Sequence, residues 1–186
     1  MEFREVLDRR VSCRKYEDRP VPRELLRQLA DAGRRAPSGC NLQQWRFIAV
    51  DDKEKKKALA QALRDPGVPA NTFTEKIPAF IVIVREPAPS MNKTQQYIIG
   101  TCGFRFITDL DIGCATMQIC LAATDLGLGS LIMGLLNQKL LREILDIPEQ
   151  LDVGLVIGVG YPQILPKPRP RRELEEVLCW NTYANA

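Results

Sequence analysis

The stretch that decides the fold of this 186-residue chain is Asp111–Leu136, DIGCATMQICLAATDLGLGSLIMGLL. Its first part, from Ile112 to Leu126, predicts a helix, because alanine, leucine and methionine are frequent there and Gly127 stands where a helix ends. Apolar residues cover this helix nearly all round, which predicts burial on nearly all sides. We therefore expect a core helix that also packs against a second copy of the protein.

A membrane-spanning helix is the alternative interpretation of this stretch. Gln118, Thr124 and Asp125 interrupt the apolar run and two glycines end it, so it falls short of the roughly twenty uninterrupted apolar residues that a span requires. The N-terminal sequence MEFREVLDRR contains no apolar segment of the kind found in signal peptides. We expect a cytoplasmic protein with no membrane partner.

The composition is that of an ordinary globular protein with a single domain, residues 1–186. Hydrophobic residues make up 45% and charged residues 26% of the chain, and no internal linker divides it. The net charge of +3 gives little support to a nucleic-acid-binding protein. Prolines space the basic residues near the C-terminus, and no aromatic platform accompanies them. We expect no nucleic-acid partner.

The chain has no histidine and six cysteines, none of them in a C-x-x-C pair. Without histidine, a zinc site and the Ser-His and Cys-His nucleophile pairs are not supported. Neither a G-x-x-x-x-G-K-[ST] loop nor a G-x-G-x-x-G loop after a strand is present. The sequence therefore predicts reduced thiols, no metal site and no catalytic side chain, so that any chemistry belongs to a cofactor.

Periodicity and turn residues predict helices and short buried strands without a strict alternation of the two. The expected helices cover residues 2–10, 22–35, 53–63, 112–126, 140–145 and 173–180. The expected strands cover residues 45–50, 79–84, 130–134 and 152–162, with a turn over 65–71 and a loop or mobile lid over 86–97. This order favours a sheet covered by helices on both faces, in the α+β class.

Two basic clusters stand near opposite ends of the chain. In an extended segment, residues two apart point the same way, so Arg10, Ser12 and Arg14 line one edge with guanidinium and hydroxyl donors. Arg169 and Arg171 repeat this spacing near the C-terminus. Such donors suit an anion with several acceptor oxygens, such as a phosphate. The alternative is a solvated basic surface that holds no ligand.

Five motifs, all in order, give the chain a resemblance to a known family. They are R-x-S-x-R-x-[FY] at Arg10–Tyr16, APSGCNLQQWRF at Ala36–Phe47, an alanine-rich helix leading to LGLGSLIMG, VIGVGYP, and a basic PKPRPRR tail. Together they resemble the FMN-dependent nitroreductase family over nearly the whole chain. The resemblance implies a three-layer α-β-α sandwich with a central, mostly antiparallel sheet. It also implies a domain-swapped homodimer with two FMN sites at the interface.

The resemblance further implies an activity and a set of cofactor contacts. Hydride would pass from NAD(P)H to flavin N5 and onward to a small electrophilic acceptor, such as a nitroaromatic or a quinone, by a ping-pong mechanism. The implied contacts to the phosphate, ribityl chain and pyrimidine side are Arg10, Val11, Ser12, Arg14, Arg169 and Arg171, with Arg172 as an alternative at the phosphate. Those from the other subunit are Pro37, Ser38, Gly39, Asn41 and Gln43, and the backbone near N5 is Ile132, Met133 and Gly134.

Departures from the family pattern leave alternatives open. Met133 stands where some members carry an acidic residue, and its side chain is equally well explained as core. Gln44 replaces the usual proline, and Asn41 would also serve to cap a turn. Cys13 and Cys40 both fall in segments implied to contact flavin, which raises the hypothesis of a redox-active pair.

The region 86–109 matches the family poorly, and in relatives it builds the lid over the flavin. Tyr97, Phe104 and Phe106 would stack there on a flat substrate, or they belong to the core. A shortened lid favours two alternative functions. One keeps FMN but changes the reaction, to flavin fragmentation or reductive dehalogenation. The other is a flavin-binding redox sensor without efficient turnover.

Overall fold

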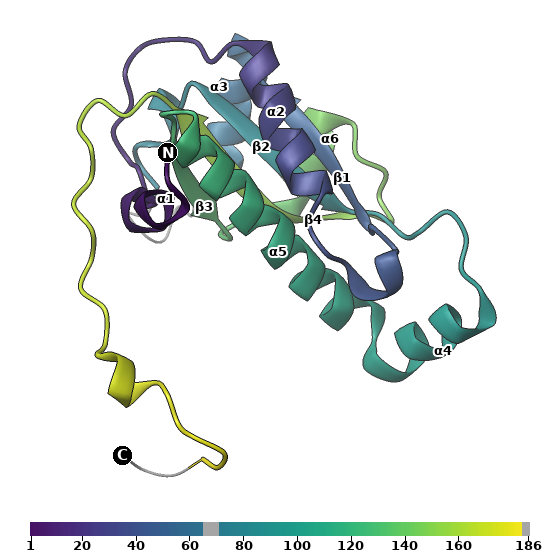
Figure 1. The fold of residues 1–186 in the computed structure, drawn as a ribbon. Helices are drawn as coiled ribbons and strands as arrows, with labels where there is room; N and C mark the ends of the chain where they lie inside the picture. The colour runs from purple at the N-terminus through teal and green to yellow at the C-terminus, as the bar shows by residue number, and fades with distance from the viewer. Residues whose placement is uncertain (65–70, 184–186) are drawn as a thin grey trace.

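The computed structural model describes residues 1–64 and 71–183, and these contain a four-stranded sheet between two layers of helices (Figure 1). The strands are β1 (Trp45–Val50), β2 (Ala79–Arg85), β3 (Gly129–Met133) and β4 (Asp152–Gly160), in the order β1-β2-β4-β3. Every neighbouring pair of strands is antiparallel. The expectation of an α+β fold with a central antiparallel sheet is confirmed.

Strand β2 forms the centre of the sheet, and all its side chains are buried. This agrees with its continuous apolar run, which predicts a strand covered on both faces. Ile81 and Ile83 pack into the cluster beneath one helical layer, while Phe80 and Val82 pack into the cluster beneath the other. Successive side chains of a strand point to opposite faces, so one strand supplies the floor of both halves of the core.

Four helices cover the two faces of the sheet, which gives the three-layer sandwich (Figure 1). Helices α2 (Arg23–Arg34) and α5 (Phe104–Asp125) pack on one face, and α3 (Lys53–Ala62) and α6 (Gln138–Leu145) pack on the other. Helix α1 (Phe3–Arg9) lies against the C-terminal part of α5, where the Met1 ammonium group donates to Asp125 Oδ1 at 2.8 Å.

Helix α5 is the long helix at the centre of the predicted fold, and it starts earlier than expected. Gly103, with a φ of 88°, separates it from α4, so the helix begins at Phe104 instead of Ile112. Ile112 and Ile119 are buried against α2 and the sheet, whereas Leu110 is 56% and Met117 42% exposed. One face of α5 is therefore uncovered in the single chain, and packing against a second copy stays a prediction.

By length and composition, α5 is the one helix among the described residues that would reach across a membrane. Half of its most apolar window is nevertheless buried inside the sandwich. Ala115 and Ala123, on the face turned toward α2, are completely buried in the same cluster as the sheet residues. The helix is thus placed as the core helix of the fold.

Two predictions of local structure are wrong. The segment 86–97 is not a loop throughout, because α4 (Lys93–Cys102) begins within it. Asn92 and Gln95 begin α4 with reciprocal side-chain-to-backbone bonds of 2.9 Å, a capping box. The helix predicted over 173–180 is a single 3-10 turn, η3 (Leu174–Glu176), because its apolar side chains are exposed and do not pack on the described part of the chain.

The remaining elements agree with the predicted ranges to within a few residues. The turn predicted over 65–71 lies, except for Asn71, outside the described residues. Two further 3-10 turns are η1 (Gly39–Asn41) and η2 (Thr74–Lys76). After β4 the chain leaves the sandwich as an extended C-terminal arm, residues 163–183 (Figure 1). The arm exposes several large apolar side chains, namely Ile164, Leu165, Leu174, Val177, Leu178, Trp180 and Tyr183.

Candidate functional site

The segment after α1 is held along the outer edge of β3. Ser12 forms an isolated parallel bridge with Ser130, and Cys13 donates its backbone N–H to the Ser130 carbonyl at 2.9 Å. Cys13 and Tyr16 are buried, while Ser12 and Arg14 are exposed. The predicted alternation in this extended segment is therefore present, and its polar side chains face away from the core.

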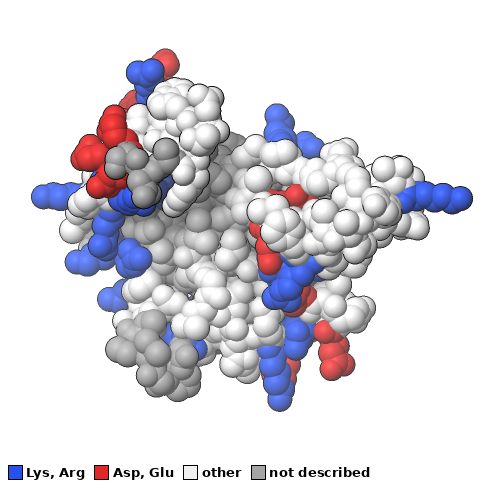
Figure 2. All heavy atoms as spheres, turned by 90° about the horizontal axis from the view of Figure 1, so that it is seen from below, with Lys and Arg blue, Asp and Glu red and all other residues white. Residues whose placement is uncertain are grey.

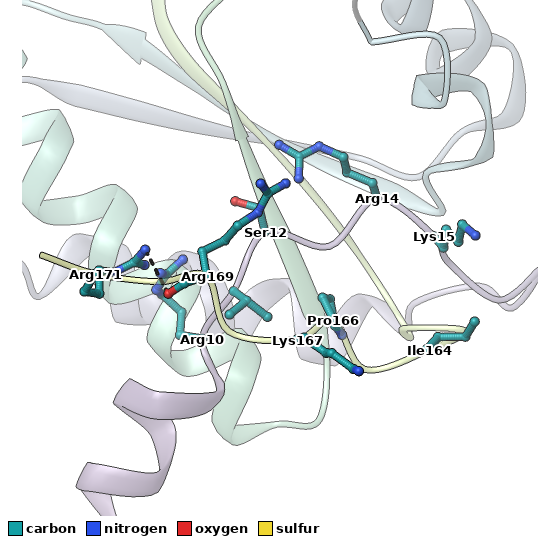
Figure 3. A pocket seen from close by; sticks show the side chains of 10 residues that line it. Arg10, Ser12, Arg14, Lys15, Ile164, Pro166, Lys167, Arg169 and Arg171 are labelled. Carbon is teal, nitrogen blue, oxygen red and sulfur yellow. Dashed lines mark hydrogen bonds between the residues drawn. The ribbon is translucent and has the colours of Figure 1, made fainter.

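These polar side chains line a cavity of about 520 Å³ together with the C-terminal arm (Figure 3). The lining residues are Arg10, Val11, Ser12, Arg14, Lys15, Ile164, Pro166, Lys167, Arg169 and Arg171. We call this cavity the basic pocket. It contains every residue predicted for the phosphate end of the site, so the two basic clusters do converge. Arg172 does not line it and donates instead to Glu176 Oε2 at 3.3 Å.

The electrostatics of the basic pocket are one-sided. Six lining side chains are cationic and none is acidic. Within residues 1–64 and 71–183, none of these six cations has a carboxylate within salt-bridge distance, and Arg171 donates only to the carbonyls of Arg169 and Pro170. Figure 3 shows Arg10, Arg169 and Arg171 together on one side of the cavity, with Lys15 and Ile164 on the other. Such a set of donors is complementary to an anion with several oxygens.

Four residues that line the pocket were not predicted as site residues, namely Lys15, Lys167, Ile164 and Pro166. Lys167 stands two residues before Arg169, so the same alternation that selected Arg169 and Arg171 would have found it. Lys15 breaks the spacing of the N-terminal segment. Its only signal in the sequence is its position next to Arg14.

In the described part of the chain, the outer edge of β3 pairs with no other strand beyond Ser130. From Ser130, beside Ser12, to Gly134 the strand advances by roughly 13 Å at the usual rise per residue. Ile132 and Gly134 are exposed, whereas the Met133 side chain is buried in the core cluster with α3 and α6. The interpretation of Met133 as a core side chain is thus correct, and only its backbone is available to a ligand.

The loop containing Pro37, Ser38, Gly39, Asn41 and Gln43 does not reach the basic pocket of the same chain. Its Gly39 N–H donates to Asp111 Oδ1, in the N-terminal half of α5, at 2.9 Å. The pocket lies near the other end of α5, where α1 and Asp125 meet, which is roughly 21 Å farther along the helix axis. One chain therefore brings together the two basic clusters but not the loop.

Cys13 and Cys40 occupy different environments at these two places. Cys13 is 1% exposed, its thiol donates to the Lys15 carbonyl at 3.2 Å, and burial raises the pKa of that thiol. Cys40 is exposed on the loop and has a φ of 52°. Within one chain the two thiols are not neighbours, so the hypothesis of a redox pair gains no support from it.

Two more polar side chains near the loop are buried. Burial raises the pKa of the Asp111 carboxyl group, and the bond from Gly39 lowers it by less. Gln44, where the family usually has proline, is fully buried, and neither atom of its side-chain amide has a partner among the described residues. The Gln44 backbone carbonyl accepts from the Glu86 N–H, just after β2, at 3.3 Å, a bond that does not depend on the side chain.

The aromatic residues predicted to form a lid lie on α4 and the first turn of α5. Tyr97 and Phe106 are exposed and Phe104 is half-buried, so Tyr97 and Phe106 are not core residues. Helix α4 projects from the sandwich (Figure 1) and is tied to the loop by the Gln95 Nε2 bond to the Cys40 carbonyl, at 3.2 Å. In the described part of the chain, no group of His, Cys, Asp or Glu side chains is placed to hold a metal ion.

Seen from below, the molecule presents a broad uncharged surface, with both basic and acidic side chains around it (Figure 2). Helices α1 and α5 carry exposed apolar side chains, among them Phe3, Leu7, Leu110 and Met117. A patch of this kind on a folded chain marks a surface that another molecule covers.

Comparison with known proteins identifies the family to which this fold and site belong. The model of the nitroreductase family matches residues 7–161. A protein of Archaeoglobus fulgidus, provisionally named an NADH dehydrogenase/NAD(P)H nitroreductase, is 34% identical over 161 residues, which are 83% of this chain and 82% of that protein. The FMN reductase [NAD(P)H] of Bacillus subtilis is 29% identical, and the match covers 94% of this chain and 71% of the reductase.

A solved structure shows the same fold at similar identity. The FMN-dependent nitroreductase of Clostridium difficile R20291 superimposes with a TM-score of 0.75 and 29% identity, covering 96% of this chain and 98% of that one. The family match extends from α1 to the residue after β4, and so includes the N-terminal segment, the loop and the end of β3. This chain belongs to the nitroreductase family.

Proposed function

We propose that this protein is an FMN-dependent oxidoreductase that transfers hydride from NAD(P)H to small electrophilic acceptors. The observation that carries the proposal is the basic pocket, in which six cationic side chains and the Ser12 hydroxyl surround a cavity of about 520 Å³ without an acidic neighbour. The phosphate of FMN is a dianion with several acceptor oxygens, and arginine binds such groups with two parallel hydrogen bonds. The donor set therefore fits the cofactor.

The residues divide into three roles around the cofactor. The phosphate and ribityl chain are held by Arg10, Val11, Ser12, Arg14, Arg169 and Arg171, with Lys15 and Lys167 adding charge. The backbone of Ile132, Met133 and Gly134 would hold the reactive edge of the ring system. The loop residues Pro37, Ser38, Gly39, Asn41 and Gln43 come from the second chain. Bound FMN supplies the hydride chemistry at N5, and the protein supplies position and electrostatics.

The hydride donor is inferred from the names of similar proteins, and the class of acceptor from exposed aromatic side chains near the loop. The similar proteins of Archaeoglobus fulgidus and Bacillus subtilis carry NAD(P)H in their names, which supports a nicotinamide cosubstrate. Nitroaromatics and quinones are the expected acceptors, and the expected mechanism is ping-pong. Tyr97 and Phe106, exposed near the loop, are available to stack on a flat acceptor.

A domain-swapped homodimer completes the site. The uncovered face of α5 and the apolar side chains of the C-terminal arm, such as Trp180 at 79% exposure, both need a covering surface. A second chain supplies it and brings its loop to the basic pocket of the first. We also propose a cytoplasmic location, with α5 as a core helix of the fold.

The experiment is a spectrum followed by stopped-flow kinetics. The purified protein should carry a yellow flavin spectrum, or gain it on addition of FMN, and should sediment as a dimer. Under anaerobic conditions NADH or NADPH should bleach the flavin rapidly, and a nitroaromatic or quinone should restore it. A colourless protein that refuses FMN would refute the proposal. Loss of intact flavin with oxygen would indicate fragmentation, and sluggish reduction by both nucleotides would indicate a sensor.

A further inference from the structure

The loop from Pro37 to Gln43 is held in a conformation that most residues avoid. Cys40, Asn41 and Gln43 have φ angles of 52°, 54° and 50°, in the left-handed region that non-glycine residues rarely adopt. All three side chains are exposed, so burial of these side chains does not compensate for the strain. A strained backbone persists only where the surrounding structure determines it, and such segments cluster at ligand-binding sites.

Bonds inside the loop define its shape. The Gln43 N–H donates to Ser38 Oγ at 3.0 Å, and Gln43 Nε2 donates to the carbonyl and side-chain oxygens of Asn41 at 3.3 Å. The Asn41 N–H donates to the Ser38 carbonyl at 2.9 Å. These bonds close the loop on itself, but they do not determine where it lies on the rest of the molecule.

The position of the loop is set by one face of α5. The Gly39 N–H donates to Asp111 Oδ1 at 2.9 Å, and a Cβ on Gly39 would lie only 2.8 Å from Ile107 Cγ2. Ile107 and Asp111 are four residues apart and therefore neighbours on the same helical face. Glycine at position 39 allows the contact, and the carboxylate of Asp111 fixes it. The second tether, from Gln95 on α4, is exposed and depends on a flexible side chain.

The Asp111 carboxyl group is buried on α5 and only partly hydrogen-bonded. It is 6% exposed, and no donor in the described part of the chain reaches its Oδ2, which is fully buried. A buried carboxylate oxygen without a partner lowers the stability of the fold, and the single bond from Gly39 compensates only in part. A purely structural role, for which an apolar side chain would serve better, does not account for it.

We propose that Asp111 is the positioning residue that holds the Gly39 backbone, and with it the loop 37–43, in the geometry that contacts the FMN bound by the partner chain. The inference rests on the proposed function. Leu110, next to Asp111, and Met117 belong to the exposed apolar face of α5, so the loop lies at the margin of the surface on which a second chain would pack. Asp111 thus connects the dimer surface to the cofactor site without touching the cofactor itself.

The test compares Asp111→Leu, Asp111→Asn and Thr116→Val in the full-length protein. Asp111→Leu removes the acceptor for the Gly39 N–H and should raise the Kd for FMN by roughly 10-fold or more. Asp111→Asn keeps an acceptor oxygen and should stay within roughly threefold of the wild type. Thr116→Val removes another buried side-chain oxygen without a partner, on the same helix but away from the loop, and should change nothing.

Two readouts separate positioning from general damage. The visible circular dichroism of bound FMN should change in Asp111→Leu and be restored in Asp111→Asn, while the dimer persists. The melting temperature of Asp111→Leu without FMN should stay within a few degrees of the wild type, because removal of the buried orphan oxygen offsets the loss of the acceptor for the Gly39 N–H. If Asp111→Leu does not give a folded dimer, the smaller Asp111→Ala replaces it with the same expected loss of FMN affinity.

Unchanged FMN affinity and dichroism in Asp111→Leu would overturn the inference and leave the proposed function intact. Equal weakening by all three substitutions would also overturn it, because it would reflect disturbed packing of α5. If the wild-type protein itself binds no FMN, the proposed function fails first, and the inference fails with it. The wild-type titration therefore distinguishes the two failures.

Discussion

Cys13 donates its backbone N–H to the carbonyl oxygen of Ser130 at 2.9 Å, and this contact fixes the arginine-bearing segment to the edge of β3. A Cβ at position 129 would lie 2.7 Å from Cβ of Cys13, so the approach requires the glycine that precedes Ser130. Ser12 and Arg14, on either side of Cys13, are thereby turned outward. The arrangement of the basic pocket follows from this packing and from the path of the C-terminal arm.

Arg169→Ala should weaken FMN binding, whereas Arg172→Ala should not. Arg169 lines the basic pocket, while Arg172 lies outside it and donates to Glu176. A charge-assisted bond to phosphate contributes about 1.5–3 kcal/mol, so its loss should raise the Kd roughly 10- to 100-fold. Titration followed by flavin fluorescence, at low and high salt, measures the effect. Equal effects of the two substitutions would remove Arg169 from the phosphate site.

Met117→Glu should convert the protein to a monomer. Met117 is exposed on the uncovered face of α5, and a carboxylate buried there without a partner would cost several kcal/mol. Ala58→Glu, on the exposed side of α3 across the sheet, places the same charge on another helix and should leave the dimer intact. Sedimentation velocity separates a 21.0 kDa species from one of twice that mass. A dimeric Met117→Glu protein would place the interface elsewhere.

Asp111→Asn should stabilise the FMN-free protein at pH 7 and lose this advantage in acid. Burial raises the pKa of Asp111 above its ordinary value of 3.8, so the folded chain binds this proton more tightly than the unfolded chain. The contribution of Asp111 to stability is therefore complete below pH 3.8 and is lost as the pH rises through the folded pKa. Asparagine has no charge to bury.

Thermal unfolding of both proteins between pH 4 and pH 7.5 tests this linkage. Each kcal/mol corresponds to a change of about 2–4 °C in Tm for a chain of this length. The Tm difference in favour of Asp111→Asn should grow with pH across the acidic range and then level off. A difference that does not vary with pH would mean that the carboxyl group does not change its charge in this range.

Cys40 should react with an aromatic disulfide reagent in the native protein, and Cys13 should not. The thiolate is the reactive form, and Cys13 is buried with its pKa raised by that burial, whereas Cys40 is exposed. Cys40→Ser should therefore remove one rapidly reacting thiol per chain, and Cys13→Ser should remove none until the protein is unfolded. Bound FMN should slow the reaction of Cys40. A fast thiol lost in Cys13→Ser would contradict the buried placement.

The parts of the site that could be predicted from sequence depend on local spacing. Arg10, Ser12 and Arg14 share an edge because alternation in an extended segment involves only neighbouring residues. The same alternation would also have predicted Lys167 as a residue of the basic pocket. Lys15 follows no such spacing, and its place depends on how the C-terminal arm passes the N-terminal segment, which is a long-range contact.

The errors in the fold have equally physical causes. Helix α4 has weak apolar periodicity and depends on the reciprocal bonds of Asn92 and Gln95, so a search for apolar faces did not find it. The predicted helix over 173–180 failed for the opposite reason. Its apolar pattern is present, but a short helix is stable only when its apolar face packs on another surface, and among residues 1–64 and 71–183 this segment stays exposed.

The separation of the loop from the basic pocket along α5 has a genetic consequence. If each chain lends its pocket to one site and its loop to the other, a mixed dimer of an Arg169→Ala chain and an Asp111→Leu chain contains one site with both lesions and one with neither. Random reassociation of two such weakened proteins should therefore regenerate roughly a quarter of the intact sites. Two alleles that each fail alone would then complement one another inside a single cell.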